Sequence, residues 1–148
     1  MIKIEKFQMK HLKKFDSEDI IPDLELSMAE NVMNPKVDIV SLVDEKGGNV
    51  VAIAGINHLR IGVGEVWIIR SKVIPYHKFE FFKIIKGLVE YVFKFMGIHR
   101  MELAIDCRWL EGDKWARSLG FRYENIAEAY DYQFNDHAIY VRIEKEQV

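Results

Sequence analysis

The clearest pattern along the chain is a long stretch of helical periodicity. After Pro75, apolar side chains fall on one face of a helix and charged side chains on the other. The apolar positions are Phe81, Phe82, Ile85, Leu88, Val89, Val92, Phe93 and Met96, and the polar ones are Lys83, Lys86, Glu90 and Lys94. Spacing near 3.6 residues predicts an amphipathic helix. It should end at Gly97, because a left-handed helix cap favours glycine.

Shorter segments have weaker helical signals. Residues 23–33 are predicted to form a helix, and residues 9–15 one or two helical turns. The apolar positions with helical spacing in the first of these are Leu24, Met28 and Val32. Residues 111–119 are predicted to form a further short helix that ends at Gly120.

Runs of apolar or alternating residues predict the strands. Residues 50–56 are continuously apolar, as in a strand buried on both faces, whereas residues 101–105 alternate as in a half-buried strand. A Gly-Gly-Asn turn before residue 50 predicts a hairpin, and Gly62 and Gly64 mark another turn. The predicted strands are residues 2–7, 39–43, 50–56, 65–69, 101–105, 121–124, 127–134 and 138–143.

This order of elements predicts an α/β (α+β) fold. Antiparallel strands followed by a crossover helix imply a central mixed, mostly antiparallel sheet of about seven strands, with helices on both faces. The strand at residues 65–69 should pair in parallel with that at residues 101–105. No repeat or linker interrupts residues 1–148, which favours a single domain.

Composition narrows the class of protein. The chain has 148 residues, 49% of them hydrophobic, and a net charge of -2, which argues against a dedicated nucleic-acid binder. No apolar run is long enough to span a bilayer and no signal peptide is evident, so a cytoplasmic location is expected. Cys107 is the single cysteine, which excludes an internal disulfide. The five histidines are scattered, so no zinc site is expected.

One motif resembles a known family. Residues 115–121 have the sequence Trp-Ala-Arg-Ser-Leu-Gly-Phe, a helix end followed by the start of a strand. With the order of elements over residues 2–143, this resembles the GNAT superfamily of acetyl-CoA-dependent N-acetyltransferases. The short sequences at residues 64–67 and 98–101 are most similar to those of GNAT-like proteins of tailed bacteriophages.

The resemblance implies acetyl-CoA as the cofactor. Its pantetheine arm would pair with the backbone of Trp67, Ile68 and Ile69, and its pyrophosphate would sit at the start of the long helix. The family's loop there contains glycines, whereas residues 73–82 contain none. The residues that would contact the phosphates instead are His77, Lys78 and Phe79; an ordinary solvated role for Lys78 is the alternative.

The resemblance also implies catalytic groups. Glu65 is the candidate general base for the attacking amine, with an ordinary strand-end residue as the alternative. The position of the family's tyrosine acid is Ala116 here. Tyr130 or Tyr132 is the candidate replacement, and a packed aromatic is the alternative for each.

Two functions follow as hypotheses. The first is an N-acetyltransferase acting on a small-molecule or protein amine. The second is a GNAT-like phage protein that has lost acetyl transfer and serves in virion structure, assembly or host interaction; its location would be the host cytoplasm or the virion. Phe79 and Phe95 fall off the main apolar stripe, and one of them is a candidate homodimer contact. Neither hypothesis involves a membrane.

Overall fold

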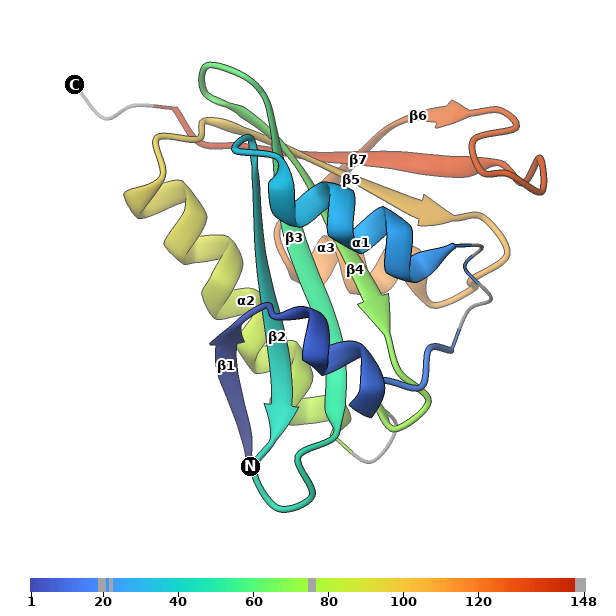
Figure 1. Cartoon of the computed structure of the whole chain (residues 1–148). Coiled ribbons are helices and arrows are strands. Elements are labelled where there is room, and N and C mark those ends of the chain that lie inside the picture. Colours follow the sequence, from blue (N-terminus) through green and yellow to red (C-terminus); the bar gives the residue numbers. More distant parts are fainter. Residues whose placement is uncertain (19–20, 22, 75–76, 146–148) are drawn as a thin grey trace. The chain divides into compact units, whose positions relative to one another are not determined.

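The computed structural model describes residues 1–18, 21, 23–74 and 77–145 (Figure 1). The strands are β1 (Ile2–Lys6), β2 (Val37–Asp44), β3 (Val50–Arg60), β4 (Val63–Arg70), β5 (Arg100–Asp106), β6 (Arg122–Ala127) and β7 (His137–Ile143). The helices are the 3₁₀ helix η1 (Met9–Lys14), α1 (Leu24–Met33), α2 (Lys78–Phe95) and α3 (Gly112–Ser118). Pro75, expected to precede the long helix, lies outside the described residues.

The strands form one seven-stranded sheet in the order β1-β2-β3-β4-β5-β7-β6. β1–β2, β2–β3, β5–β7 and β6–β7 are antiparallel, whereas β4 and β5 are parallel. The crossover between the parallel pair contains α2, because parallel neighbours need a long connection. The predicted mixed, mostly antiparallel sheet is therefore confirmed.

The chain divides into two compact units. The first contains Met1–Asn57 and Trp67–Gly87, and the second contains His58–Val66 and Leu88–Val148. The chain therefore passes from one unit to the other within β3, β4 and α2.

The core of the first unit lies where β2 and β3 meet the segments that follow β1. Its buried members are Phe7, Met28, Val43, Val50 and Ile53. Met28 is the buried position of α1, whereas Val32, at the same helical spacing, is 49% exposed. Burial of apolar area on this scale is the main stabilising contribution to such a unit.

A buried histidine fixes η1 on the first unit. His11 Nδ1 accepts hydrogen bonds from the Gln8 backbone N–H (3.0 Å) and the Ser41 hydroxyl (2.9 Å), and its Nε2 lies 3.3 Å from a Glu5 carboxylate oxygen. The trio resembles a catalytic triad in composition only. Ser41 is fully buried, so no substrate reaches its hydroxyl. The network satisfies polar groups in the core.

The second unit is built around β5 and its neighbours. Met101, Leu103 and Ile105 are buried and alternate with half-buried residues, as predicted. β5 pairs with β7 along its whole length, from Arg100 opposite Ile143 to Asp106 opposite His137. This pairing places the end of β5 beside the start of β7.

The motif at the end of α3 has a clear physical role. Gly120 has φ of +90°, and its N–H donates to the Arg117 carbonyl (2.9 Å), while the Phe121 N–H donates to the Ala116 carbonyl (3.1 Å). These two bonds are those of a Schellman cap, which favours glycine at the left-handed position. The Arg142 guanidinium donates to the Leu119 carbonyl (3.0 Å) and completes the cap.

Two local predictions are wrong. Residues 127–134 do not form a strand: β6 ends at Ala127, and a loop with left-handed residues at Ala129 and Phe134 follows. Gly64 is not a turn residue but lies inside β4. The turn needs only Gly62, whose φ is +79°.

Candidate active site

Glu65 and Tyr130, the two predicted catalytic residues, both lie in the second unit. Glu65 is half-buried on β4, opposite Glu102 on β5. Tyr130 lies in residues 128–136, the loop between β6 and β7 that we call the β6–β7 loop. Burial, followed by the negative charges of Glu65 and Glu102, raises the pKa of Tyr130. The structure therefore brings the predicted base into the electrostatic environment of the predicted acid.

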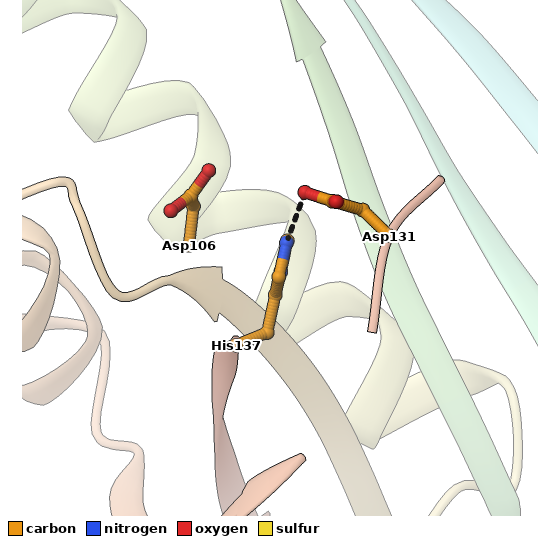
Figure 2. A group of neighbouring side chains, drawn as sticks. All are labelled: Asp106, Asp131 and His137. Atoms are coloured by element: carbon orange, nitrogen blue, oxygen red, sulfur yellow. Dashed lines mark hydrogen bonds and ion pairs between the residues drawn. The ribbon is translucent and has the colours of Figure 1, made fainter. Parts of the chain in front are cut away.

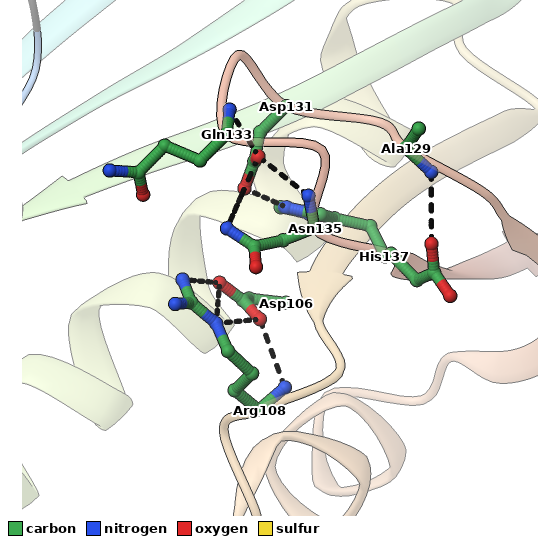
Figure 3. A network of polar contacts seen from close by, with 8 residues as sticks. Asp106, Arg108, Ala129, Asp131, Gln133, Asn135 and His137 are labelled. Atoms are coloured by element: carbon green, nitrogen blue, oxygen red, sulfur yellow. Dashed lines mark hydrogen bonds and ion pairs between the residues drawn. The ribbon is translucent and has the colours of Figure 1, made fainter.

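The β6–β7 loop is organised by Asp131 (Figure 3). Its Oδ1 accepts hydrogen bonds from the backbone N–H groups of Gln133 (2.9 Å) and Asn135 (3.0 Å), and its Oδ2 lies 3.1 Å from His137 Nε2. These bonds, led by the one from the Asn135 backbone, lower the pKa of Asp131 to about 2. An aspartate that collects nearby backbone donors competes with a strand ladder. That competition explains the missing strand at residues 127–134.

Tyr130 is held by backbone and ring contacts of this loop. Its N–H donates to the Asn135 carbonyl (2.9 Å), and its ring centroid lies 4.9 Å from that of His137. The side chain remains 46% exposed. Tyr132, the alternative acid, is 57% exposed. A positioned, partly exposed phenol with a raised pKa stays protonated near neutral pH and is able to donate a proton.

The predicted pantetheine strand belongs to the first unit. Trp67 and Ile69 pack against that unit's core, and the Trp67 indole N–H donates to Asn57 Oδ1 (3.0 Å). The side chains of Trp67 and Ile69 are therefore occupied by packing and hydrogen bonding, so the predicted pantetheine contact would involve the main chain. In the described part of the chain, the β4–β5 ladder ends at Val66, so Trp67, Ile68 and Ile69 have no β5 partner.

Two carboxylates lie near the start of α2 in the first unit, and each has a partner of its own. Asp44 lies 3.6 Å from His77 Nε2, and Glu80 Oε1 accepts the Ile2 backbone N–H. Lys78 and Phe79 are exposed, with Lys78 Nζ 5.8 Å from the Phe79 ring centroid. The first turn of a helix presents backbone N–H groups without intrahelical partners. Lys78 and this turn fit an anion, although no glycine allows close backbone approach there.

The structure assembles one group that the sequence did not suggest. Asp106 at the end of β5, Asp131 in the β6–β7 loop and His137 at the start of β7 each offer a ligand atom, all within 4.8 Å of one another (Figure 2). Although the histidines are scattered in sequence, His137 therefore does meet carboxylates in space. Asp106 and His137 lie at strand ends, where polar residues are too common to single these two out, and Asp131 lies between strands with no such signal.

Comparison with known proteins gives matches at the level of structure. No protein-family model matches the chain, and no curated protein sequence matches it. A chimera of the spermidine N-acetyltransferase SpeG from Vibrio cholerae and hSSAT superposes with a TM-score of 0.75 at 11% identity, covering 96% of this chain and 95% of that one. The ribosomal-protein-S5-alanine acetyltransferase from Vibrio fischeri superposes with a TM-score of 0.68 at 15% identity, covering 96% and 92%.

The chain has the GNAT acetyltransferase fold. The fold prediction made from the order of elements is thus confirmed over nearly the whole chain. At these identities the likeness concerns the GNAT fold and not the chemistry. No helix among the described residues combines the length and apolarity that a bilayer span requires.

Proposed function

We propose that this GNAT-fold protein is an N-acetyltransferase that transfers an acetyl group from acetyl-CoA to an amine. The observation that supports this most is the proximity of Tyr130 to Glu65, since it supplies an acid and a base within one unit. Glu65 accepts the proton that the amine loses on attack, directly or through a water molecule. Tyr130 donates a proton to the departing sulfur.

The cofactor is assigned to the first unit. Acetyl-CoA supplies the thioester and hence the acetyl group. The main chain of Trp67, Ile68 and Ile69 is proposed to pair with the amide groups of pantetheine. His77, Lys78 and Phe79 are proposed to contact the pyrophosphate, with Lys78 as the principal cation. The Lys78 ammonium group then supplies part of the phosphate binding that backbone N–H groups supply in the family's glycine-containing loop.

The acceptor is proposed to be an amine that is cationic in solution. The acetyltransferases with similar structures act on spermidine and on a ribosomal-protein alanine, as their names state. Glu65 and Glu102 place two carboxylates in the environment of Tyr130, and Glu102 also pairs with Arg100 Nε (3.0 Å). The negative charge at this place is proposed to attract an ammonium group before it is deprotonated.

A second candidate function rests on the start of α2. The lack of glycine in residues 73–82, together with carboxylates at Asp44 and Glu80, favours a GNAT-fold protein that no longer binds acetyl-CoA tightly. Such a protein would act in phage structure, assembly or host interaction. A homodimer through the exposed Phe79 or Phe95 is compatible with either function.

Calorimetric titration and a thiol-release assay separate these candidates. We expect acetyl-CoA to bind at micromolar to millimolar concentration, and free thiol to appear when spermidine or a peptide with a free N-terminus is added. Glu65→Gln should lower kcat by about 100-fold or more with little change in cofactor affinity. Glu128→Gln, at an exposed glutamate, is the matched control. Absence of binding at millimolar acetyl-CoA favours the second candidate.

A further inference from the structure

A mixed carboxylate–imidazole cluster lies at one end of the second unit, and the transferase chemistry does not use it. Its three side chains come from separate segments: Asp106 ends β5, Asp131 lies in the β6–β7 loop, and His137 begins β7 (Figure 2). The exposed fractions of these side chains are 28%, 25% and 16%. They are therefore more enclosed than the surface pair Lys72–Asp16, whose fractions are 62% and 75%.

The spacing of the ligand atoms suits a small divalent ion. All three lie within 4.8 Å of one another, and His137 Nε2 and Asp131 Oδ2 are 3.1 Å apart. Two ligands of a tetrahedral zinc ion with bonds of about 2.1 Å lie about 3.4 Å apart. Movement of the Asp106 carboxylate by up to about 1.4 Å, the difference between 4.8 Å and 3.4 Å, then completes a three-ligand set.

The second observation concerns the imidazole itself. His137 Nδ1 is buried and has no hydrogen-bond partner among the described residues. The ring is therefore held by the bond at Nε2 and leaves its other nitrogen unsatisfied, whichever tautomer it adopts. The proposed ion would bind at Nε2, the nitrogen that faces Asp131, and Nδ1 would then carry the proton and donate it to a water molecule.

Two contacts compete with the ion. The hydrogen bond between His137 Nε2 and Asp131 Oδ2 (3.1 Å) must break, because both atoms would bind the ion. The Arg108 guanidinium forms a two-pronged ion pair with Asp106, at 2.7 Å from Nη2 to Oδ2 and 3.1 Å from Nε to Oδ1 (Figure 3). The Arg108 side chain is 66% exposed, so water screens this ion pair and the guanidinium can turn into solvent. A cation that binds Asp106 can therefore displace it.

We propose that Asp106, Asp131 and His137 bind a divalent transition-metal ion, with Zn²⁺ as the reference ion. An imidazole among the ligands favours such ions over Ca²⁺ and Mg²⁺, which prefer oxygen. The ion ties the end of β5 and the start of β7 to the β6–β7 loop, and so fixes the loop that contains Tyr130. The site does not depend on the proposed transferase function.

Titration of the intact protein with Zn²⁺ tests the site. We expect one equivalent to bind to the wild type, and His137→Gln and Asp106→Asn each to weaken binding by about 100-fold or more. His99→Gln, at an exposed histidine of the same unit, should leave the affinity unchanged. Excess Ca²⁺ should not compete. Weakening by His99→Gln equal to that by His137→Gln would indicate adventitious surface binding and overturn the proposal.

Two measurements do not depend on variants that lose a ligand. Arg108→Gln frees Asp106 and should tighten Zn²⁺ binding about two- to fivefold, a gain that misfolding cannot produce. In the wild type, Zn²⁺ should slow hydrogen exchange at the amides of Tyr130, Gln133 and Asn135. Unchanged affinity in Arg108→Gln together with unchanged exchange in the loop excludes a metal on Asp106 and contradicts the proposal.

Discussion

At the scale of single residues, Gly55 shows how a missing side chain positions a large one. A Cβ placed on Gly55 would lie 2.2 Å from the Trp67 ring, well inside any real contact. The ring therefore lies against bare backbone of β3, and its N–H reaches Asn57. The position of the Trp67 ring against β3 thus depends on Gly55 having no Cβ atom.

Gly55→Ala is expected to destabilise the protein by about 1–3 kcal/mol, the usual cost of forcing extra volume into a packed region. Urea unfolding measures this. Trp67→Leu removes the clashing ring, so the double variant Gly55→Ala/Trp67→Leu should be more stable than the sum of the two single effects predicts. Simple additivity would contradict the close packing of Gly55 and Trp67.

Gly120 provides a second prediction at this scale. At φ of +90°, alanine is strained by about 1–2 kcal/mol, and its Cβ would also lie 3.2 Å from the Arg142 side chain. Gly120→Ala should therefore lower the free energy of unfolding by more than Gly97→Ala, where φ is +67° but no atom lies within 4 Å. Gly87→Ala, in open space within α2, should instead stabilise by about 0.5–1 kcal/mol. Chemical denaturation of the three variants gives the ranking.

Tyr140 connects β7 to α3 through a bond that titrates. Its hydroxyl donates to Asp113 Oδ1 (2.6 Å), and burial together with that carboxylate raises the pKa of Tyr140 to about 12. The folded pKa lies above the ordinary value of 10. The bond therefore stabilises the fold fully below pH 10 and is lost as pH rises towards 12.

Titration of the Tyr140 ring carbon by NMR should show this midpoint near pH 12. In Asp113→Asn the midpoint should fall but stay above 10, since burial is the larger cause. A midpoint that does not respond to this substitution would mean that Asp113 exerts no electrostatic effect on the phenol.

At the scale of elements, the sequence predicted what local periodicity determines. The long helix and the alternation along β5 are correct, because each pattern repeats often enough to exclude alternatives. The strand predicted at residues 127–134 is wrong. Their aromatic residues favour a strand, but Asp131 accepts hydrogen bonds from backbone N–H groups of the same segment and so competes with a strand ladder. That competition depends on where Asn135 and His137 lie in space, which composition does not reveal.

The same difference between local sequence pattern and contacts made in space applies to the candidate site. The GNAT resemblance predicts both Glu65, at the start of a predicted strand, and Tyr130, as a replacement for the family's tyrosine, and both roles stay predictions. The neighbours that change the chemistry of Tyr130 are Glu65 and Glu102, 65 and 28 positions earlier in the chain. The sequence does not predict the cluster of Asp106, Asp131 and His137 for the same reason. The β5–β7 register places Asp106 opposite His137, and the fold of the β6–β7 loop brings in Asp131.

At the scale of the whole molecule, the order of elements predicted the fold better than any motif did. Similarity at 11–15% identity extends over 96% of the chain. Strand order and one parallel crossover restrict the topology strongly, whereas most side chains are free to vary. The same freedom explains why the GNAT fold leaves the activity open, since function depends on a few residues placed on it.

The proposed function assigns different steps to Lys78 and Tyr130, and this assignment gives the last prediction. Lys78 belongs to the first unit and is assigned to the cofactor's phosphates, whereas Tyr130 belongs to the second unit and is assigned to proton donation. Lys78→Ala should therefore raise KM for acetyl-CoA about three- to tenfold with kcat nearly unchanged, as loss of a charged contact made equally in ground and transition states does.

Tyr130→Phe should do the reverse, lowering kcat about 100-fold while the dissociation constant for acetyl-CoA stays within about twofold. Tyr132→Phe is the matched control, because Tyr132 lies in the same loop and is more exposed. Steady-state kinetics at saturating amine, with calorimetry on each variant, measures both quantities. If Tyr132→Phe lowers kcat as much as Tyr130→Phe, the loop acts through its packing and the acid must be sought elsewhere. If Lys78→Ala changes kcat and leaves KM unaltered, the cofactor's phosphates do not bind at the start of α2.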